Sequence, residues 1–390
     1  MNPSKTPSVR FKGYEDEWEE RKLKDVVEKQ IKGKAQFEKL APGDVEYLDT
    51  SRLNGGQAIL TNGLKDVTLD DVLILWDGSK AGTVYHGFEG SLGSTLKAYR
   101  TSADSKFVYQ YLKRYQDNIY NNYRTPNIPH VQKDFLDVFT ISVPRSDEQA
   151  KIGSFFKQLD NTITLHQRKL NLLNEQKKGF LQKMFPKNGE KIPEIRFAGF
   201  NDDWEDRKVS DFSKTTYGGG TPKTAVAEYW DGNIPWIQSS NLTVDDVQDV
   251  NLDKFITDDA IKNSAAKLIP ANSIAIVTRV GVGKLTLMKQ EFATSQDFLS
   301  LSDLQVDEQF GLYSIYKLLK KELNNIQGTS IKGMTKADLL TKDIMIPTEK
   351  NEQAKVGAFF QNLDNTITLH QRKIDELKSM KKSMLQKMFV

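Results

Sequence analysis

The glycine-rich run at residues 281–284 could bind a ligand through its backbone. It reads Gly-Val-Gly-Lys, which is close to the phosphate-binding loop of nucleotide-binding proteins. That loop needs the pattern G-x-x-x-x-G-K-[ST], whose N–H groups cradle the phosphates. Here Thr278 stands in place of the first glycine and Leu285 in place of the final hydroxyl residue. We therefore expect a tight turn between two strands, with Arg279 and Lys284 at its tip.

Residues that could carry catalysis are sparse. The chain has no cysteine, which excludes disulfides, thiolate catalysis and cysteine-ligated zinc, and fits a reducing cytoplasm. Two of its histidines, His86 and His130, have no metal-ligand companions at a useful spacing. The [DNS]-P-P-[YF] motif of amino-methyltransferases and a P-D…(D/E)-x-K nuclease core are both missing. We expect no catalytic residue, no metal ligand and no cofactor bound by this chain.

Polar and basic residues gather instead in the predicted turns of two regions, where they suit DNA contacts. Arginine and lysine can donate to guanine O6 and N7 or to phosphates, and asparagine and glutamine can pair with adenine. A solvated turn is the alternative interpretation for each residue taken alone. In the first region the candidates are Asp77, Ser79, Lys80, Arg124, Asn127 and His130. In the second region they are Gly219, Thr221, Lys223, Ser240, Asn241, Thr278, Arg279, Lys284, Gln296 and Lys332.

The elements that must position these residues follow from a duplication. Residues 148–185 occur again as residues 352–389, and 26 of the 38 aligned residues are identical. A period of 204 residues is too long for a solenoid repeat, which spans about 20–50 residues, so it indicates two whole domains. A shorter lead-in, residues 9–26 and 195–212, also opens each half. Each half is therefore lead-in, globular domain and long helix.

Charge is concentrated in the duplicated stretches. The first carries seven basic against three acidic residues and the second seven against four, a net charge of +7 for the two. The whole chain has a net charge of +3, so the remainder carries −4. A DNA-binding face on the globular parts must therefore be a local basic patch.

Each duplicated stretch has the heptad pattern of a long helix in a coiled coil. Such an apolar stripe needs a partner, and we expect the two helices to pair antiparallel with each other. His166 and His370 interrupt the stripe at equivalent places, either as polar residues that set the register or as a pH switch or ligand. The predicted seam residues are Ile152, Phe156, Leu159, Ile163, Leu170, Leu173, Val356, Phe360, Leu363, Ile367, Ile374 and Leu377.

The globular parts are predicted to mix strands and helices. The expected order in each is strand–turn–strand, amphipathic helix, and a final strand followed by proline. The corresponding ranges are 67–85, 102–122 and 127–144 in the first half, and 267–288, 307–327 and 330–347 in the second. The fold class is therefore α+β, with two globular α/β domains joined and separated by two long helices packed as an antiparallel coiled coil. The predicted segments are domain 1 at 1–146, helix 1 at 147–185, a linker at 186–194, domain 2 at 195–349 and helix 2 at 350–390.

The chain resembles the specificity subunits of type I restriction–modification systems over its full length. The resemblance rests on both R-F-x-G-[YF] lead-ins, on GGTPK in the second domain and on IPWIQSSNL at residues 234–242. It rests above all on the two openings that run into LDNTITLHQRK. The first domain departs from the family pattern, because it lacks the GGTP signature.

The resemblance implies recognition of double-stranded DNA without catalysis. Each globular domain would read one half of a bipartite, asymmetric target, and the helices would fix the unread spacer. The helices would also dock two methyltransferase (modification) subunits, through which restriction subunits join. S-adenosylmethionine, ATP and Mg would then be bound by those partner subunits.

Two other classes of protein remain open at this point. A coiled-coil scaffold whose globular ends bind proteins would explain the helices, but not two divergent domains on one frame. A self-contained DNA methyltransferase or nuclease would need the missing motifs.

The chain start lacks an apolar signal segment and no run of about 18 apolar residues occurs, so we expect a cytoplasmic protein.

Overall fold

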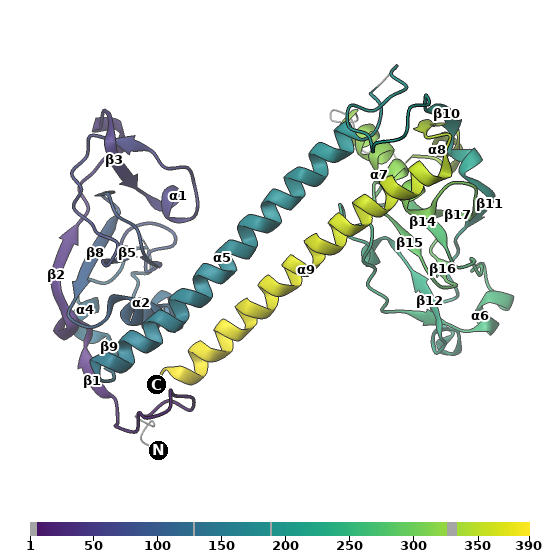
Figure 1. Cartoon of the computed structure of the whole chain (residues 1–390). Helices are drawn as coiled ribbons and strands as arrows, with labels where there is room; N and C mark the ends of the chain where they lie inside the picture. Colours follow the sequence, from purple (N-terminus) through teal and green to yellow (C-terminus); the bar gives the residue numbers. More distant parts are fainter. Residues whose placement is uncertain (1–5, 128, 188, 326–333) are drawn as a thin grey trace. The chain divides into compact units, whose positions relative to one another are not determined.

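The computed structural model describes residues 6–127, 129–187, 189–325 and 334–390. These residues form two compact units. The first combines the described residues up to Gln167 with Lys373–Val390, and the second is Arg168–Arg372. The divisions fall inside α5 (Ser146–Lys183) and α9 (Lys350–Met388), so each unit holds part of both helices (Figure 1). The domain boundaries given above treat each long helix as a separate segment and stay a prediction.

The first unit is built from three sheets within its described residues. The antiparallel sheet β2-β8-β5-β6 contains β2 (Val27–Lys32), β5 (Val72–Leu75), β6 (Val84–His86) and β8 (Leu96–Thr101). The sheet β4-β3-β7 contains β3 (Pro42–Leu48), β4 (Leu60–Thr61) and β7 (Ser91–Leu92), and β1 (Glu19–Lys22) pairs with β9 (Thr140–Val143). The helices are α1 (Thr50–Leu53), α2 (Ser105–Arg114), α3 (Gln116–Asn122) and α4 (Phe135–Val138), with 3-10 turns η1 (Leu23–Val26) and η2 (Phe37–Lys39).

The second unit repeats this arrangement within its own described residues. The antiparallel sheet β11-β17-β14-β15 contains β11 (Ser213–Gly218), β14 (Ser273–Val277), β15 (Leu285–Met288) and β17 (Phe298–Leu304). The sheet β13-β12-β16 contains β12 (Ile234–Ile237), β13 (Phe255–Ile256) and β16 (Ala293–Thr294), and β10 (Glu205–Lys208) pairs with β18 (Asp343–Ile346). The helices are α6 (Asp258–Asn263), α7 (Glu308–Asn325) and α8 (Lys336–Leu340), with η3 (Val209–Phe212), η4 (Ala227–Trp230) and η5 (Ser239–Asn241).

One inner strand of each four-stranded sheet, β5 in the first unit and β14 in the second, is buried on both faces. In β5, Val72 and Ile74 join the main core, which includes α2, while Leu73 and Leu75 join a second apolar cluster. Residues alternate between faces along a strand, so a continuous apolar run such as VLIL suits a strand covered on both sides. In β14, Ile274 and Ile276 lie in the main core of the second unit. Trp76 and Thr278, each four residues further along the chain, donate equivalent backbone bonds to Thr95 and Asp297, so Val72 is the structural counterpart of Ile274.

The predicted elements of the globular parts are confirmed. Residues 67–85 contain β5 and all of β6 except His86, and residues 267–288 contain β14 and β15. The helix expected at 102–122 is divided at Tyr115 into α2 and α3. The one expected at 307–327 is the single helix α7, and residues 326 and 327 of that range lie outside the described residues. Sequence reasoning did not anticipate that the lead-ins form strands, β1 and β10, that pair with the last strand of each half.

The repeated motifs hold the start of each long helix. The guanidinium of Arg10 donates to both carboxylate oxygens of Glu148, at 2.7 and 2.8 Å, and Arg196 does the same to Glu352, at 2.8 and 2.9 Å. Both glutamates are buried. A bidentate arginine–carboxylate pair is among the stronger charged contacts in proteins. The lead-in arginine and the glutamate of each helix opening are therefore parts of one structural contact.

The far end of each long helix completes an aromatic core. In the first unit, the Phe389 ring lies 6.1 Å from Trp18 and 5.7 Å from Phe156. In the second unit, Phe185 lies 5.9 Å from both Trp204 and Phe360. These aromatic contacts are typical edge-on or tilted packing. Each unit thus buries the end of the helix that begins in the other half of the sequence.

Within each unit the two helix segments run in opposite directions. In the first unit, Phe156 contacts Phe389 while Asp160, one turn further, bonds to Lys381. In the second unit, Lys177 pairs with Asp364 while Phe180 contacts Phe359. Residue numbers rise along one segment as they fall along the other, which is the antiparallel direction expected from the sequence. The coiled-coil packing of the full helices stays a prediction.

Most residues of the predicted seam are buried. The half-buried residues are Ile163, Leu363 and Ile367. His166 and His370 are also half-buried, and their role as register-setting residues or as a pH switch stays a prediction. The buried seam residues are Ile152, Phe156, Leu159, Leu170, Leu173, Val356, Phe360, Ile374 and Leu377.

Candidate nucleic-acid interface

Loops of the second unit meet at one end of its sheets. The backbone N–H of Thr278, just after β14, donates to the Asp297 carbonyl oxygen at 2.8 Å. Ser295, just after β16, donates from its N–H to the carbonyl of Ile237 at 2.9 Å. Gly220 donates to the carbonyl of Thr294 at 2.8 Å. These bonds bring the predicted segments around residues 219–223, 238–241, 278–284 and 295–297 together, although they are far apart in the sequence.

Three of the predicted contact residues in these loops hold the loops themselves. Asn241 is buried, and its amide donates to the Asn251 carbonyl and the Asp253 carboxylate, both at 2.7 Å. The Thr278 hydroxyl is also buried and donates to the Asp297 carbonyl at 3.0 Å. Lys284 donates from Nζ to the carbonyl of Ser239 at 3.0 Å. These side chains support the loop surface from within.

Close packing of the backbone explains why Gly219, one of the predicted contact residues, is a glycine. A Cβ at Gly219 would overlap the carbonyl oxygens of Ser295 and Thr294, so a side chain cannot be accommodated there. The Thr221 hydroxyl donates to Gln296 Oε1 at 2.9 Å. Lys223 and Ser240 are exposed. Lys332 lies outside the described residues.

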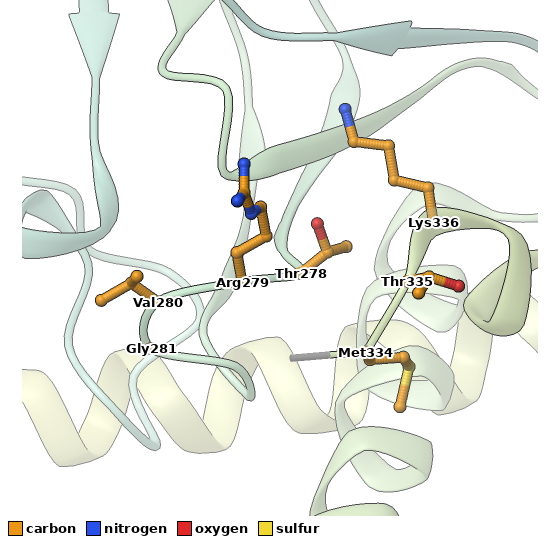
Figure 2. A pocket seen from close by; sticks show the side chains of 7 residues that line it. All are labelled: Thr278, Arg279, Val280, Gly281, Met334, Thr335 and Lys336. Atoms are coloured by element: carbon orange, nitrogen blue, oxygen red, sulfur yellow. The ribbon is translucent and has the colours of Figure 1, made fainter. Parts of the chain in front are cut away.

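Arg279 opens onto a pocket that the sequence did not reveal. The pocket has a volume of about 660 Å³ and is lined by Thr278, Arg279, Val280, Gly281, Met334, Thr335 and Lys336. Figure 2 shows the side chains of Arg279 and Lys336 extended toward the same side. Burial lowers the pKa of the Lys336 ammonium, with Lys267 and Arg279 adding to the shift. No sequence motif pointed to Lys336, because it is far from Arg279 in the sequence and only folding brings the two residues to one pocket.

The first unit brings its predicted residues together in a similar way. Asp77 forms a β-bridge with His130, and the Gly78 N–H donates to the Pro129 carbonyl at 2.9 Å. Arg124 reaches back to this turn, donating from Nη1 to the Ser79 carbonyl at 3.1 Å. Two segments about fifty residues apart in the sequence therefore form one surface.

Arg124 and His130 both have contacts within this surface. The Arg124 Nε also donates to the Tyr120 carbonyl at 2.7 Å, so the side chain braces the turn. His130 Nδ1 lies 3.0 Å from the Thr125 hydroxyl. Asp77, Ser79, Lys80 and Asn127 are exposed.

Lys97 is a further cation at this surface that sequence reasoning missed. Its ammonium lies 3.1 Å from the centre of the Trp76 ring, a cation–π contact. Burial lowers the pKa of Lys97, and Lys32 adds to the shift while Asp77 opposes it. Lys97 stands in β8 and Trp76 follows β5, so only the pairing of these strands brings the cation to the loop.

The described residues lack the features of two other kinds of site. Among residues 6–127, 129–187, 189–325 and 334–390, no three histidines, aspartates or glutamates are grouped as a metal would need. Over that same part of the chain, no helix combines the length and apolar character needed to cross a bilayer.

Comparisons with known proteins identify the family. The model of the type I restriction modification DNA specificity domain matches twice, at residues 15–175 and 201–379. Over 396 residues the chain is 24% identical to the type I restriction enzyme MjaVIII specificity subunit of Methanocaldococcus jannaschii, covering 95% of this chain and 91% of that protein. Over 168 residues it is 32% identical to the EcoR124I/EcoR124II specificity subunit of Escherichia coli, covering 39% and 40%.

A solved structure shares the fold. The S subunit of a type I restriction–modification system from M. genitalium matches with a TM-score of 0.72 and 13% identity, covering 99% of both chains. The family match, once in each half, agrees with the duplicated topology. The chain therefore belongs to the type I restriction–modification specificity family, whose members are non-catalytic subunits of a multisubunit enzyme.

Proposed function

We propose that this chain gives a type I complex its DNA sequence preference, with each unit reading one half of a bipartite, asymmetric target. One observation carries the proposal: equivalent loops of one repeated topology bear different side chains, Asp77 in the first unit and Arg279 in the second. Base identity is read by side chains and not by the backbone frame, so this arrangement suits two different half-sites. The long helices fix the spacing of the half-sites and leave the intervening base pairs unread.

The exposed face of the duplicated helix motif supports a docking role. The side chains of Leu165 and Leu369 are 67% and 66% exposed. They stand at equivalent places in the run LDNTITLHQRK, which is identical in both helices. Core packing cannot explain identity at exposed positions, whereas an apolar side chain presented twice suits contact with two copies of one partner. We infer that each copy docks one methyltransferase subunit.

The catalytic chemistry then belongs to the partners. S-adenosylmethionine would be held by the methyltransferase subunits, and ATP and Mg by subunits of the assembled enzyme. Restriction subunits would join through the methyltransferase subunits. The complex would work on double-stranded DNA in the cytoplasm.

Methylome sequencing tests the specificity role. The chain is co-expressed with its modification subunit in a host that lacks other methylation systems. We expect methylated adenines in a two-part, asymmetric motif with a fixed gap. A stable complex that methylates no defined motif would contradict the proposal and favour a scaffold role.

Capture of the modification subunit tests the docking surface. We expect the double variant Leu165→Asp with Leu369→Asp to lose capture, because a carboxylate cannot enter an apolar contact without a partner. Leu172→Asp is the matched control: Leu172 is 51% exposed, but its repeat counterpart is already acidic, Glu376. Equal capture by the double variant and the wild type would exclude these leucines from the interface.

A further inference from the structure

The pocket beside Arg279 is open to a ligand and carries two cations. Arg279 and Val280 are exposed, and Val280 is 74% exposed. Lys336 contributes the second cation from the start of α8, and Figure 2 shows both charged side chains directed to the same side of the pocket. A ligand in this pocket would therefore meet a guanidinium and an ammonium together, with Val280 as an apolar neighbour.

The position of Lys336 is fixed by the structure around it. Thr335 caps α8: its hydroxyl donates to the Asp338 carboxylate at 2.6 Å and accepts from the Asp338 N–H at 3.0 Å. Gly218, at the end of β11, leaves space for the ammonium, because a Cβ there would lie 2.8 Å from Lys336 Nζ. The cap fixes the backbone at the start of α8, and Gly218 leaves room for the ammonium of Lys336.

The two cations are not neutralised by the protein. Among the residues that the structure describes, no carboxylate oxygen lies within 4.0 Å of either cation. Residues 326–333, which precede Met334 in the sequence, include no aspartate or glutamate. Asp297 acts on Lys336 and raises its pKa, but burial and the charges of Lys267 and Arg279 outweigh it. The pocket thus favours a ligand that brings negative potential.

The donors that the pocket offers to a ligand are those of its two cations, Arg279 and Lys336. The hydroxyl of Thr278 already donates to the Asp297 carbonyl, and that of Thr335 to the Asp338 carboxylate. Arginine and lysine have donors and no acceptor. In the major groove, guanine offers two acceptors, O6 and N7, whereas adenine and cytosine each offer an amino donor, for which neither cation has an acceptor. A phosphate is also an acceptor without donors, so it is the other source of the same chemistry.

We propose that Arg279 and Lys336 together read a guanine in the half-site bound by the second unit, through its O6 and N7 acceptors. The inference rests on the proposed function and assigns a base and a second recognition residue, Lys336, to one half of the target. Val280 then lies where it can contact the neighbouring base, for which a thymine methyl is the apolar partner.

The experiment uses the chain assembled with its modification subunit. Selection from a library of random DNA duplexes first gives the preferred target. Each guanine of the second half-site is then replaced, one at a time, by 7-deazaguanine, which keeps base pairing but lacks the N7 acceptor. We expect one position at which this replacement weakens wild-type binding by roughly 5- to 150-fold.

Variants link that position to the pocket. Arg279→Met and Lys336→Met each remove the donors but keep a long side chain, and we expect both to lose most of the sensitivity to 7-deazaguanine. Lys289→Gln is the matched control, because Lys289 follows the far end of β15 and pairs with Glu308. The control should keep the wild-type sensitivity.

Three results would overturn the inference in distinguishable ways. Equal loss of affinity on all sequences in both variants, with a smaller salt dependence, would assign the cations to phosphates. A selected second half-site without a sensitive guanine would remove the base assignment but leave the two-part target intact. No sequence preference in the wild-type complex would refute the proposed function itself.

Discussion

The β5–β6 loop of the first unit and the β14–β15 loop of the second differ in charge although the backbone anchors them alike. Trp76 donates from its N–H to the Thr95 carbonyl at 2.8 Å, and Thr278 donates to the Asp297 carbonyl at 2.8 Å. The next residue is Asp77 in one loop and Arg279 in the other. The backbone bonds set where the loop lies, and the side chain is left to vary. A duplicated frame can therefore carry two recognition chemistries without altering its sheets.

The helices show the converse, because identical residues lie in different surroundings. Lys177 and Asp364 pair at 2.7 Å with side chains only 8% and 6% exposed. Their repeat counterparts, Lys381 and Asp160, pair at 2.6 Å but are 17% and 29% exposed. In the second unit the Tyr313 hydroxyl donates to Asp364 at 2.7 Å and helps to bury it.

Burial of the Lys177–Asp364 pair has an electrostatic consequence. It raises the pKa of Asp364, although Lys177 opposes the shift. In the first unit, Asp160 accepts from the Gln110 amide at 2.8 Å, in place of a tyrosine, in addition to its bond with Lys381. The neighbouring domain, not the helix sequence, decides how deeply the ion pair is buried.

The largest expected effect comes from breaking these two pairs separately. We expect Asp364→Ala to lower the free energy of unfolding of the second unit by about 3–5 kcal/mol, because it leaves the Lys177 ammonium buried without its partner. Asp160→Ala should lower that of the first unit by about 1–2 kcal/mol, because water can reach Lys381. Hydrogen exchange of α7 and of α2 in urea measures the two losses separately.

The paired design is its own control, since both variants remove the same side chain from the same repeated motif. Glu175→Ala adds a second reference, because it removes an exposed helix carboxylate whose repeat counterpart is Ser379. Equal destabilisation by Asp364→Ala and Asp160→Ala would show that burial does not distinguish the two pairs.

An intermediate effect is expected from a histidine that only the first unit has. His86 in β6 pairs with Val72, whereas its counterpart in β15, Leu287, pairs with Ile274. The His86 ring stacks on Tyr109 at a centroid distance of 5.6 Å. A titratable ring thus stands where the second unit has an aliphatic core residue.

Acid should therefore weaken the first unit in particular. Burial lowers the pKa of His86 to about 4, with Lys157 and Lys106 adding to the shift and Asp70 and Asp104 opposing it. The unfolded chain, with an ordinary pKa near 6.5, then binds the proton more readily. The stabilising contribution is complete above pH 6.5 and is lost as the pH falls toward 4, by about 3 kcal/mol.

Replacing the ring measures this contribution. We expect His86→Leu to flatten the decrease in stability of the first unit between pH 6.5 and 4, followed by hydrogen exchange of β5. The second unit, followed through β14, should keep its own pH dependence in the variant. An unchanged acid response of the first unit would show that His86 is not the responsible group.

The duplicated parts of this fold could be predicted because they repeat. The helix openings, the lead-ins and the antiparallel direction follow from matching sequences and a heptad pattern that needs a partner. The role of Arg10 could not be seen, because its partner Glu148 is 138 residues away and only folding joins them. The pairing of β1 with β9 likewise joins residues far apart in the sequence, such as Glu19 and Val143.

The candidate site was predictable in part for a related reason. Turns rich in glycine and polar residues located the loops, and the structure brings these loops together. Residue type alone could not separate Asn241, which is buried and bonded within the protein, from Arg279, which is exposed. Lys97 and Lys336 were missed because each comes from an element other than the loop it faces. Which of these residues touch DNA stays a prediction.

The smallest expected effect tests whether the two loops act independently. A carboxylate can accept from the amino group of cytosine, and an asparagine can both accept and donate, so Asp77→Asn should relax the preference of the first half-site. We expect a change of about 1–2 kcal/mol in discrimination there, and none in the second half-site.

Arg279→Met should change the discrimination in the second half-site and leave that in the first half-site unchanged. Binding of the assembled complex to duplexes altered in one half-site at a time measures both changes, and the double variant should show their sum, because sites without shared contacts are additive. A change in the second half-site caused by Asp77→Asn would mean that the units do not read their half-sites separately.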